Sequence, residues 1–276
     1  MVNQWIYVVL LALVQGVTEF LPVSSSGHLA VLGSLFGFEE SDSLSLGIVL
    51  HAGSLAAIVA VYFHELWKFL RPERRHLLVM LILGTIPAGT AGVLLKKLNL
   101  DSMLFGDMLL VGVGFLITGA VLRLTGRRKL VAKSESREAT PIEKLSWRQA
   151  LIIGMAQMAA ITPGVSRSGS TIAAGVLCGL ERTAAATFSF LLAIPVIGGA
   201  AFLEILKLCS GKAAPVDGMP PMLLLLGFAV SAAVSFGALR LLLRIVRKGR
   251  LCWFSWYMFA VGASVCCWQL YLLVNK

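Results

Sequence analysis

The chain contains one motif of 25 residues twice, and the two copies align without a gap. The first copy is Gln15–Glu39 and the second is Gln157–Glu181, and nine of the 25 aligned positions are identical. Each copy consists of a short apolar run, a break rich in Ser and Gly, and a second short apolar run. Because such breaks interrupt regular structure, each copy predicts two short helices joined by a turn rather than one continuous helix.

The two copies carry different chemical groups at matching positions. The first copy has Glu19 and Ser25 where the second has Ile161 and Arg167. A duplicated scaffold whose halves differ in this way predicts one composite site to which both copies contribute.

The composition is that of an integral membrane protein. Hydrophobic residues make up 58% of the chain, charged residues only 14%, and the mean hydropathy is +0.86. Soluble domains average about 45–50% apolar and about 25% charged residues. The net charge of +10 lies in short blocks between apolar segments and forms no basic stripe interleaved with aromatics, so we expect no nucleic-acid partner.

Ten apolar runs predict the secondary structure. A helix needs about 20 apolar residues to cross a bilayer. Six runs approach that length: Leu44–Phe63, Leu77–Leu95, Met108–Leu122, Thr183–Leu203, Met222–Leu239 and Leu251–Val274. Four shorter runs flank the two Ser-Gly breaks: Trp5–Thr18, Leu29–Phe38, Gln149–Thr162 and Thr171–Leu180. We expect these four to form two re-entrant pairs, because irregular backbone at membrane depth persists only inside protein or beside water.

These elements predict an all-α polytopic membrane protein with two inverted repeats, six spanning helices and two re-entrant helix–turn–helix pairs. Residues 1–276 would form a single membrane domain, with repeat one at about 1–125, a linker at about 126–146 and repeat two at about 147–276. Each repeat has three spans, an odd number, so the second repeat must lie inverted relative to the first. Sites in such folds form near the midplane, where the repeats meet.

The loop charges predict the orientation of the chain in the membrane. The loops on the side of the linker carry 17 Lys and Arg residues, and the loops and terminus on the other side carry five. By the positive-inside rule the linker is cytoplasmic, and both termini lie on the opposite side.

The second motif copy predicts an anion site. Ser166–Thr171 offers hydroxyls and helix-terminal amides around Arg167, and such a helix start is a ready site for phosphate. Close helix packing would account for the Gly and Ser content but not for an arginine at membrane depth. The predicted phosphate-binding residues are Ser24, Ser26, Gly27, Ser166, Ser168, Gly169, Ser170 and Thr171.

The first motif copy predicts a catalytic group and a cation site. Gln15 and Glu19 are four residues apart and share a helix face, so their oxygens suit a divalent cation; the alternative is that Glu19 only solvates the turn. If the Ser-Gly turn continues into a helix, Ser25 and His28 are three residues apart and share a face of it. Ser25 would act as the nucleophile and His28 as the proton shuttle. The alternative of direct attack by water stays open. His51, inside a span, is expected to be a helix-packing histidine.

These motifs resemble those of the bacterial undecaprenyl-pyrophosphate phosphatase (bacitracin-resistance) family. The resemblance rests on the segments 15–28 and 163–169 and extends over essentially the whole chain. It implies a metal-dependent hydrolase of the bacterial inner membrane that faces the periplasm. Such an enzyme converts undecaprenyl pyrophosphate to undecaprenyl phosphate, the recycled lipid carrier of peptidoglycan synthesis, and confers bacitracin resistance. The chain departs from the family at Gln15, where Glu is frequent.

The complete sequence-based hypothesis is a phosphoric anhydride hydrolase. Its catalytic residues would be Glu19, Ser25, His28 and Arg167, and its Mg²⁺ or Ca²⁺ would be held by Glu19 and Gln15. A polyprenyl-phosphate flippase using the same anion site is the main alternative, because inverted repeats are a transporter architecture. The expected partners are the polyprenyl pyrophosphate substrate and membrane lipid, and a homodimer is left open.

Overall fold

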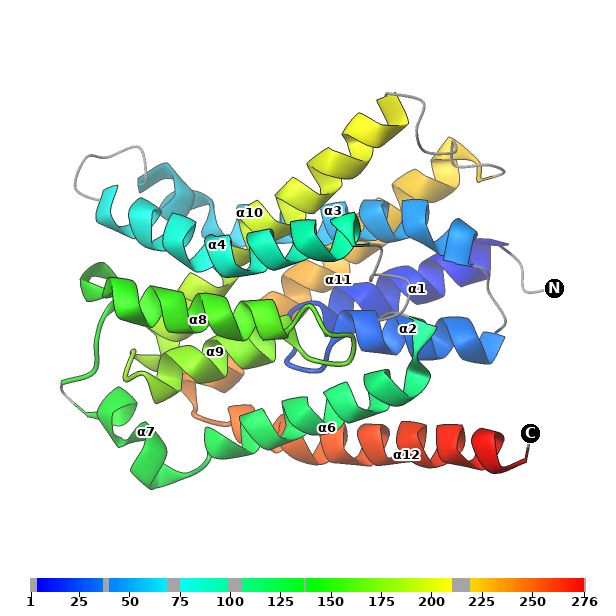
Figure 1. Ribbon diagram of the computed structural model, residues 1–276. Coiled ribbons are helices and arrows are strands. Elements are labelled where there is room, and N and C mark those ends of the chain that lie inside the picture. The colour runs from blue at the N-terminus through cyan, green and yellow to red at the C-terminus, as the bar shows by residue number, and fades with distance from the viewer. Residues whose placement is uncertain are drawn as a thin grey trace.

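The computed structural model describes residues 4–36, 40–68, 75–98, 106–136, 138–209 and 219–275. Throughout this part of the chain the regular structure is helical, as the hydropathy predicts (Figure 1). The four short helices around the Ser-Gly breaks are α1 (Gln4–Thr18), α2 (Ser25–Phe36), α8 (Trp147–Ala159) and α9 (Arg167–Leu177).

Within the described residues, five long helices are apolar enough to cross a membrane, so the chain is a multi-pass membrane protein. They are α3 (Glu40–Lys68), α4 (Arg75–Lys97), α10 (Arg182–Cys209), α11 (Pro221–Arg247) and α12 (Phe254–Val274). The sixth expected span, α6 (Met108–Leu124), has 17 residues and packs along α12. A helix of that length lies at the lower limit of the range of about 17–25 residues for a span. The prediction of six spans is therefore confirmed for five, and α6 is shorter than the rest.

The two short-helix pairs enter the molecule from opposite ends. In Figure 1 the α1–α2 pair opens toward the side on which both termini lie, and the α8–α9 pair opens toward the side of α7. The packing is reciprocal, because α1 lies against α11 while α8 lies against α4. As a result, the turns of the two pairs approach each other in the interior of the molecule, as expected for re-entrant segments of opposite orientation.

The linker is more ordered than its polar composition predicts. It contains α7 (Arg128–Glu135) and a 3₁₀ turn, η2 (Ile142–Lys144). Val131 and Leu145 are fully buried, so the linker contributes apolar side chains to the core. The Thr140 N–H donates to Gly179 O (2.9 Å), and the Glu181 N–H donates to Thr140 O (3.0 Å). The linker is thereby fastened to the end of α9.

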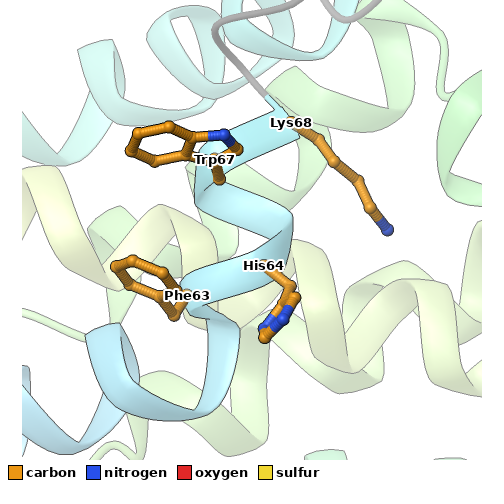
Figure 2. Close-up of a pocket in the computed structure, with 4 residues that line it drawn as sticks. All are labelled: Phe63, His64, Trp67 and Lys68. Carbon is orange, nitrogen blue, oxygen red and sulfur yellow. The ribbon is translucent and has the colours of Figure 1, made fainter.

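Aromatic and charged side chains mark the end of α3 on the side of the linker. Figure 2 shows Phe63 and Trp67 projecting from one side of this helix end, and His64 and Lys68 from the other. The rings of Phe63 and Trp67 stack with centroids 6.2 Å apart, and Lys68 pairs with Glu65 at 2.6 Å. Aromatic rings beside basic residues are typical of the boundary between hydrocarbon and water.

We expect the linker and the C-terminus to be accessible from opposite sides of the membrane. In a cysteine-free background, Glu138→Cys and Asn275→Cys should react differently with an impermeant thiol reagent in intact cells, with only Asn275→Cys labelled. Both positions are exposed, whereas Ser134 in the same linker is buried and donates a hydrogen bond to Leu180 O. Labelling of Glu138→Cys from outside would contradict the orientation inferred from the loop charges.

Candidate active site

The two Ser-Gly turns meet at an ion pair. Arg167 Nη2, from the second motif copy, lies 2.6 Å from Glu19 Oε1, from the first. Both side chains are largely buried, with 16% and 6% of their surface exposed. Beside the pair is a cavity of about 50 Å³ lined by Thr18, Glu19, Ser24, Ser25, Ser26, Ala160, Val165, Ser166 and Arg167. The predicted composite site therefore has a structural counterpart, built from residues of both copies.

An unusual backbone conformation at Ser24 shapes the first turn. Helix α1 ends at Thr18, and Ser24 adopts a φ of +67°, which few residues other than glycine adopt. The Ser24 hydroxyl accepts from the Gly27 N–H at 3.4 Å and so satisfies an amide in the first turn of α2. This reversal places Ser25 at the start of α2, facing back toward Glu19. Strained backbone of this kind is characteristic of functional sites.

Repeat one holds the second turn in place. Ser166 caps α9 by accepting from the Gly169 N–H at 3.1 Å. The Ser166 N–H donates to Thr118 Oγ1 in α6 (2.9 Å), and the Thr118 hydroxyl donates to Gly164 O (3.0 Å). Gly164 has a φ of +84°, and a Cβ there would lie 2.1 Å from Val111 O. The arginine-bearing turn can therefore approach α6 so closely only with glycine at this position.

Glu19 is the centre of the hydrogen-bond network. Besides the ion pair with Arg167, it accepts from Ser25 Oγ at 2.7 Å and from Gln15 Nε2 at 3.0 Å. An ionised carboxylate has about four acceptor positions, and protein donors fill three of them here. The group placed to receive the Ser25 proton is therefore Glu19.

Ser25 and His28 both lie in the first turn of α2, but their hydrogen bonds go to different partners. Its Nδ1 lies 2.8 Å from Ser24 O, which can only accept, so in the neutral ring Nε2 accepts from the Tyr257 hydroxyl at 2.7 Å. The ring lies 5.0 Å from that of Phe115 and stacks on Tyr257 at 5.7 Å. Ser25 turns back toward α1, whereas His28 points toward α6 and α12. Although the structure describes both residues, no hydrogen bond joins them.

His51 belongs to the site, although the sequence predicts a packing role for it. Its Nδ1 accepts from Gln15 Nε2 at 2.8 Å and lies 3.5 Å from Glu19 Oε2. One amide group thus bridges the imidazole and the carboxylate. One sequence feature could have identified His51: an ionisable residue inside an apolar span is by default a functional candidate.

Several predicted phosphate ligands use their polar groups inside the protein instead. The Ser168 hydroxyl donates to Leu21 O (3.2 Å), and Thr171 Oγ1 donates to Arg167 O (2.7 Å). The backbone N–H of Ser170 donates to Ser166 O at 2.9 Å within α9. These contacts fix α9 and its arginine. Of the predicted phosphate-binding residues, Ser24, Ser26 and Ser166 line the cavity, whereas Gly27, Ser168, Gly169, Ser170 and Thr171 do not.

Two buried polar atoms at the site have no hydrogen-bond partner among the residues that the structure describes. They are Arg167 Nη1, which can only donate, and Gln15 Oε1, which can only accept. A buried polar group left unpaired costs about 1–3 kcal/mol, so each of these atoms has capacity for a ligand or a water molecule. A donor suits an anion such as phosphate, and an amide oxygen beside a carboxylate suits a hard cation.

The oxygen atoms of Glu19 and Gln15 fit a cation that is also bound by the phosphates of the substrate. The described residues contain no cluster of three His, Cys, Asp or Glu side chains. Mg²⁺ often keeps several waters and binds through one or two carboxylates together with substrate phosphates, so it needs no such cluster. Glu19 and Gln15 provide the carboxylate and the free oxygen.

Comparison with known proteins identifies the family. The family described as bacitracin resistance protein BacA matches residues 8–264. A protein named undecaprenyl-diphosphatase from Desulfatibacillum aliphaticivorans is 41% identical, over 95% of this chain and 97% of its own length. Proteins of the same name from Rhodopirellula baltica and Bacteroides thetaiotaomicron are 41% and 34% identical, covering 95% and 96% of this chain and 97% and 99% of their own lengths. The chain belongs to the bacitracin resistance protein BacA family.

Proposed function

We propose that the chain is an undecaprenyl-diphosphatase, which hydrolyses undecaprenyl pyrophosphate to undecaprenyl phosphate and inorganic phosphate. The observation that carries this proposal is the single carboxylate, Glu19, that accepts from both Arg167 and Ser25 across the two motif copies. Arg167 can bind a phosphate group, and Ser25 can attack it because Glu19 is placed to accept the hydroxyl proton. The names of the relatives support this choice of substrate.

Arg167 would bind the pyrophosphate together with hydroxyls from both turns. Its Nη1 is free, and the planar guanidinium matches two phosphate oxygens at once. The start of α9 adds backbone N–H groups and the positive end of the helix dipole. Ser24, Ser26 and Ser166 line the same cavity and offer further donors.

Ser25 would attack the terminal phosphorus of the pyrophosphate. As the Ser25 Oγ–P bond forms, the hydroxyl proton passes to Glu19 Oε2, 2.7 Å away. The bond from that phosphorus to the bridging oxygen breaks, and the lipid phosphate leaves with the bridging oxygen and its electron pair. Water then hydrolyses the phosphoserine and releases inorganic phosphate. His28, held by Ser24 and Tyr257, would shape the turn that presents Ser25.

A divalent cation, Mg²⁺ or Ca²⁺, would be held by Glu19 and Gln15 together with substrate oxygens. When bound, it neutralises charge that develops on the transferred phosphoryl group. The Gln15 amide is already oriented for this role, because its nitrogen is engaged by Glu19 and His51 and its oxygen is free.

We expect Gln15→Glu to lower the Mg²⁺ concentration needed for half-maximal activity. The change replaces a neutral oxygen ligand by a charged one of the same length, and the affinity of a site for hard cations depends on its ligand charge. A metal titration of phosphate release measures the effect, with Gln157→Glu, the matching position of the other repeat, as the control. An unchanged metal requirement would leave Glu19 as the sole side-chain ligand.

The proposed location is the bacterial inner membrane, with the active site facing the periplasm. The α1–α2 pair opens toward the side with few basic residues, on which both termini lie (Figure 1). The positive-inside rule assigns that side to the periplasm.

Release of phosphate from a polyprenyl pyrophosphate by the purified protein tests the proposal directly. Wild-type protein should release one phosphate per substrate, and the Arg167→Ala protein should release almost none. Absence of phosphate release combined with movement of polyprenyl phosphate across protein-containing vesicles would favour the flippase instead.

A further inference from the structure

A second cavity lies behind the active site, toward the side of the linker. Its volume is about 590 Å³, within the range of about 300–1,000 Å³ typical of ligand pockets. It extends from the turn after α1 to the end of α11 and the start of α12. Its lining residues are Val17, Thr18, Leu21, Val23, Leu241, Arg244, Ile245, Lys248, Arg250, Trp253, Phe254 and Tyr257.

Three cationic side chains, Arg244, Lys248 and Arg250, form the rim of this cavity. All three are exposed, and none forms an ion pair with an acidic residue in the described part of the chain. Arg250 also lies over the ring of Trp253, with 4.6 Å between its Cζ and the ring centroid. The rim therefore carries positive charge that the described protein does not neutralise.

Below the rim the walls are almost entirely apolar. Val17 and Leu21 come from the re-entrant segment, Leu241 and Ile245 from α11, and Phe254 from α12. A basic rim above apolar walls complements a molecule with an anionic head and a hydrocarbon chain. Basic pockets between transmembrane helices on the cytoplasmic side bind anionic lipid head groups by this combination.

We propose that this basic-rimmed cavity binds an anionic phospholipid from the leaflet on the side of the linker. The phosphate would lie between Arg244 and Lys248, one turn apart at the end of α11, and an acyl chain would cover Leu241 and Ile245. The cavity is distinct from the active site, because Arg167 and the serines line only the other cavity and Thr18 is the one described residue that lines both. Tyr257, which donates to His28, forms part of its wall, so an occupied cavity would also support His28.

The test uses Trp253, an exposed side chain that lines the cavity, as a reporter. A protein in which the other tryptophans are Phe is placed in phosphatidylcholine nanodiscs with increasing fractions of brominated lipid. Brominated phosphatidylglycerol should quench Trp253 at a severalfold lower mole fraction than brominated phosphatidylcholine. Each basic residue near an anionic lipid surface contributes about 1 kcal/mol, or about fivefold in affinity, so Arg244→Gln with Lys248→Gln should remove the preference.

A matched control separates a bound lipid from general attraction. A protein with only Trp147, which is exposed at the same side of the membrane, should show no comparable preference for phosphatidylglycerol. Equal quenching of Trp253 by both lipids, or an unchanged preference in the double variant, would overturn the proposal. Displacement of phosphatidylglycerol by stoichiometric polyprenyl phosphate would also overturn it, since the cavity would then belong to the substrate.

Native mass spectrometry of the otherwise unaltered protein gives an independent measurement. Protein released from mixed micelles should retain one phosphatidylglycerol, and the Arg244→Gln/Lys248→Gln protein should not. The equivalent double variant at Lys144 and Arg148, outside the cavity, should retain the lipid like wild type. Equal retention by all three proteins would refute the site whether or not the protein hydrolyses pyrophosphate.

Discussion

Arg167→Lys should lower phosphate release by about two orders of magnitude or more, a loss comparable to that of an oxyanion-stabilising donor. Lysine keeps the positive charge near Glu19 but loses the planar fork that can hold Glu19 and a phosphate at the same time. The measurement is steady-state hydrolysis of a polyprenyl pyrophosphate by purified protein, with thermal unfolding recorded in parallel. Arg167→Ala should be at least as inactive, and less stable, because it leaves the buried Glu19 without its cation.

Arg182→Lys is the matched control. Arg182 begins α10 as Arg167 begins α9, and it also pairs with a glutamate, Glu135, but this pair lies in the linker region away from the cavity. Near-normal hydrolysis is expected for this variant. Comparable activity of the Arg167 and Arg182 variants would remove Arg167 from the phosphate-binding site.

Glu19→Gln should lower turnover by about 10²–10⁴-fold, the contribution typical of a positioned general base. The glutamine preserves the size of the side chain but cannot receive the Ser25 proton, and it cannot neutralise Arg167. His28→Gln should cost considerably less, because His28 is bonded to Ser24 and Tyr257 rather than to Ser25. Single-turnover hydrolysis separates an effect on chemistry from an effect on binding.

Glu65→Gln, which removes the partner of Lys68 at the end of α3, serves as the control for loss of a paired carboxylate. It should leave hydrolysis intact. A larger loss in His28→Gln than in Glu19→Gln would reverse the assignment and return His28 to the role of proton acceptor.

Hydropathy and spacing predict most of the helical framework. Two apolar runs of about a dozen residues on either side of a Ser-Gly break cannot each cross a bilayer, so a re-entrant pair follows directly from length. The order in the linker could not be predicted in the same way. Val131 lies in the three-residue apolar run 130–132, and Leu145 is a single apolar residue in a polar stretch. They are buried because α7 packs on α9 and η2 packs on α10 and α4.

The site residues also fall into those that the sequence predicts and those that it does not. Glu19, Ser25 and Arg167 lie inside the repeated motif, and the difference between the copies marks them. His51 and Tyr257 come from spans distant in sequence, so their contacts depend on helix packing that no local pattern encodes. His28 bonds to Ser24 O and to Tyr257 in α12, and a helical spacing rule does not predict these partners.

The hydrogen bonds between Thr118 and the arginine-bearing turn limit how the two halves of this chain can change. Gly164 and Ser166 are bonded to Thr118, and a Cβ at Gly114 would lie 2.3 Å from Pro163 O. The turn of the second half that carries Arg167 therefore packs closely on α6, a helix of the first half. Consider a hybrid protein that joins the first half of one relative to the second half of another. It would keep Arg167 but misplace it if α6 of the one did not fit the arginine-bearing turn of the other. A substitution on either side of this contact is therefore expected to need a compensating substitution in the other half.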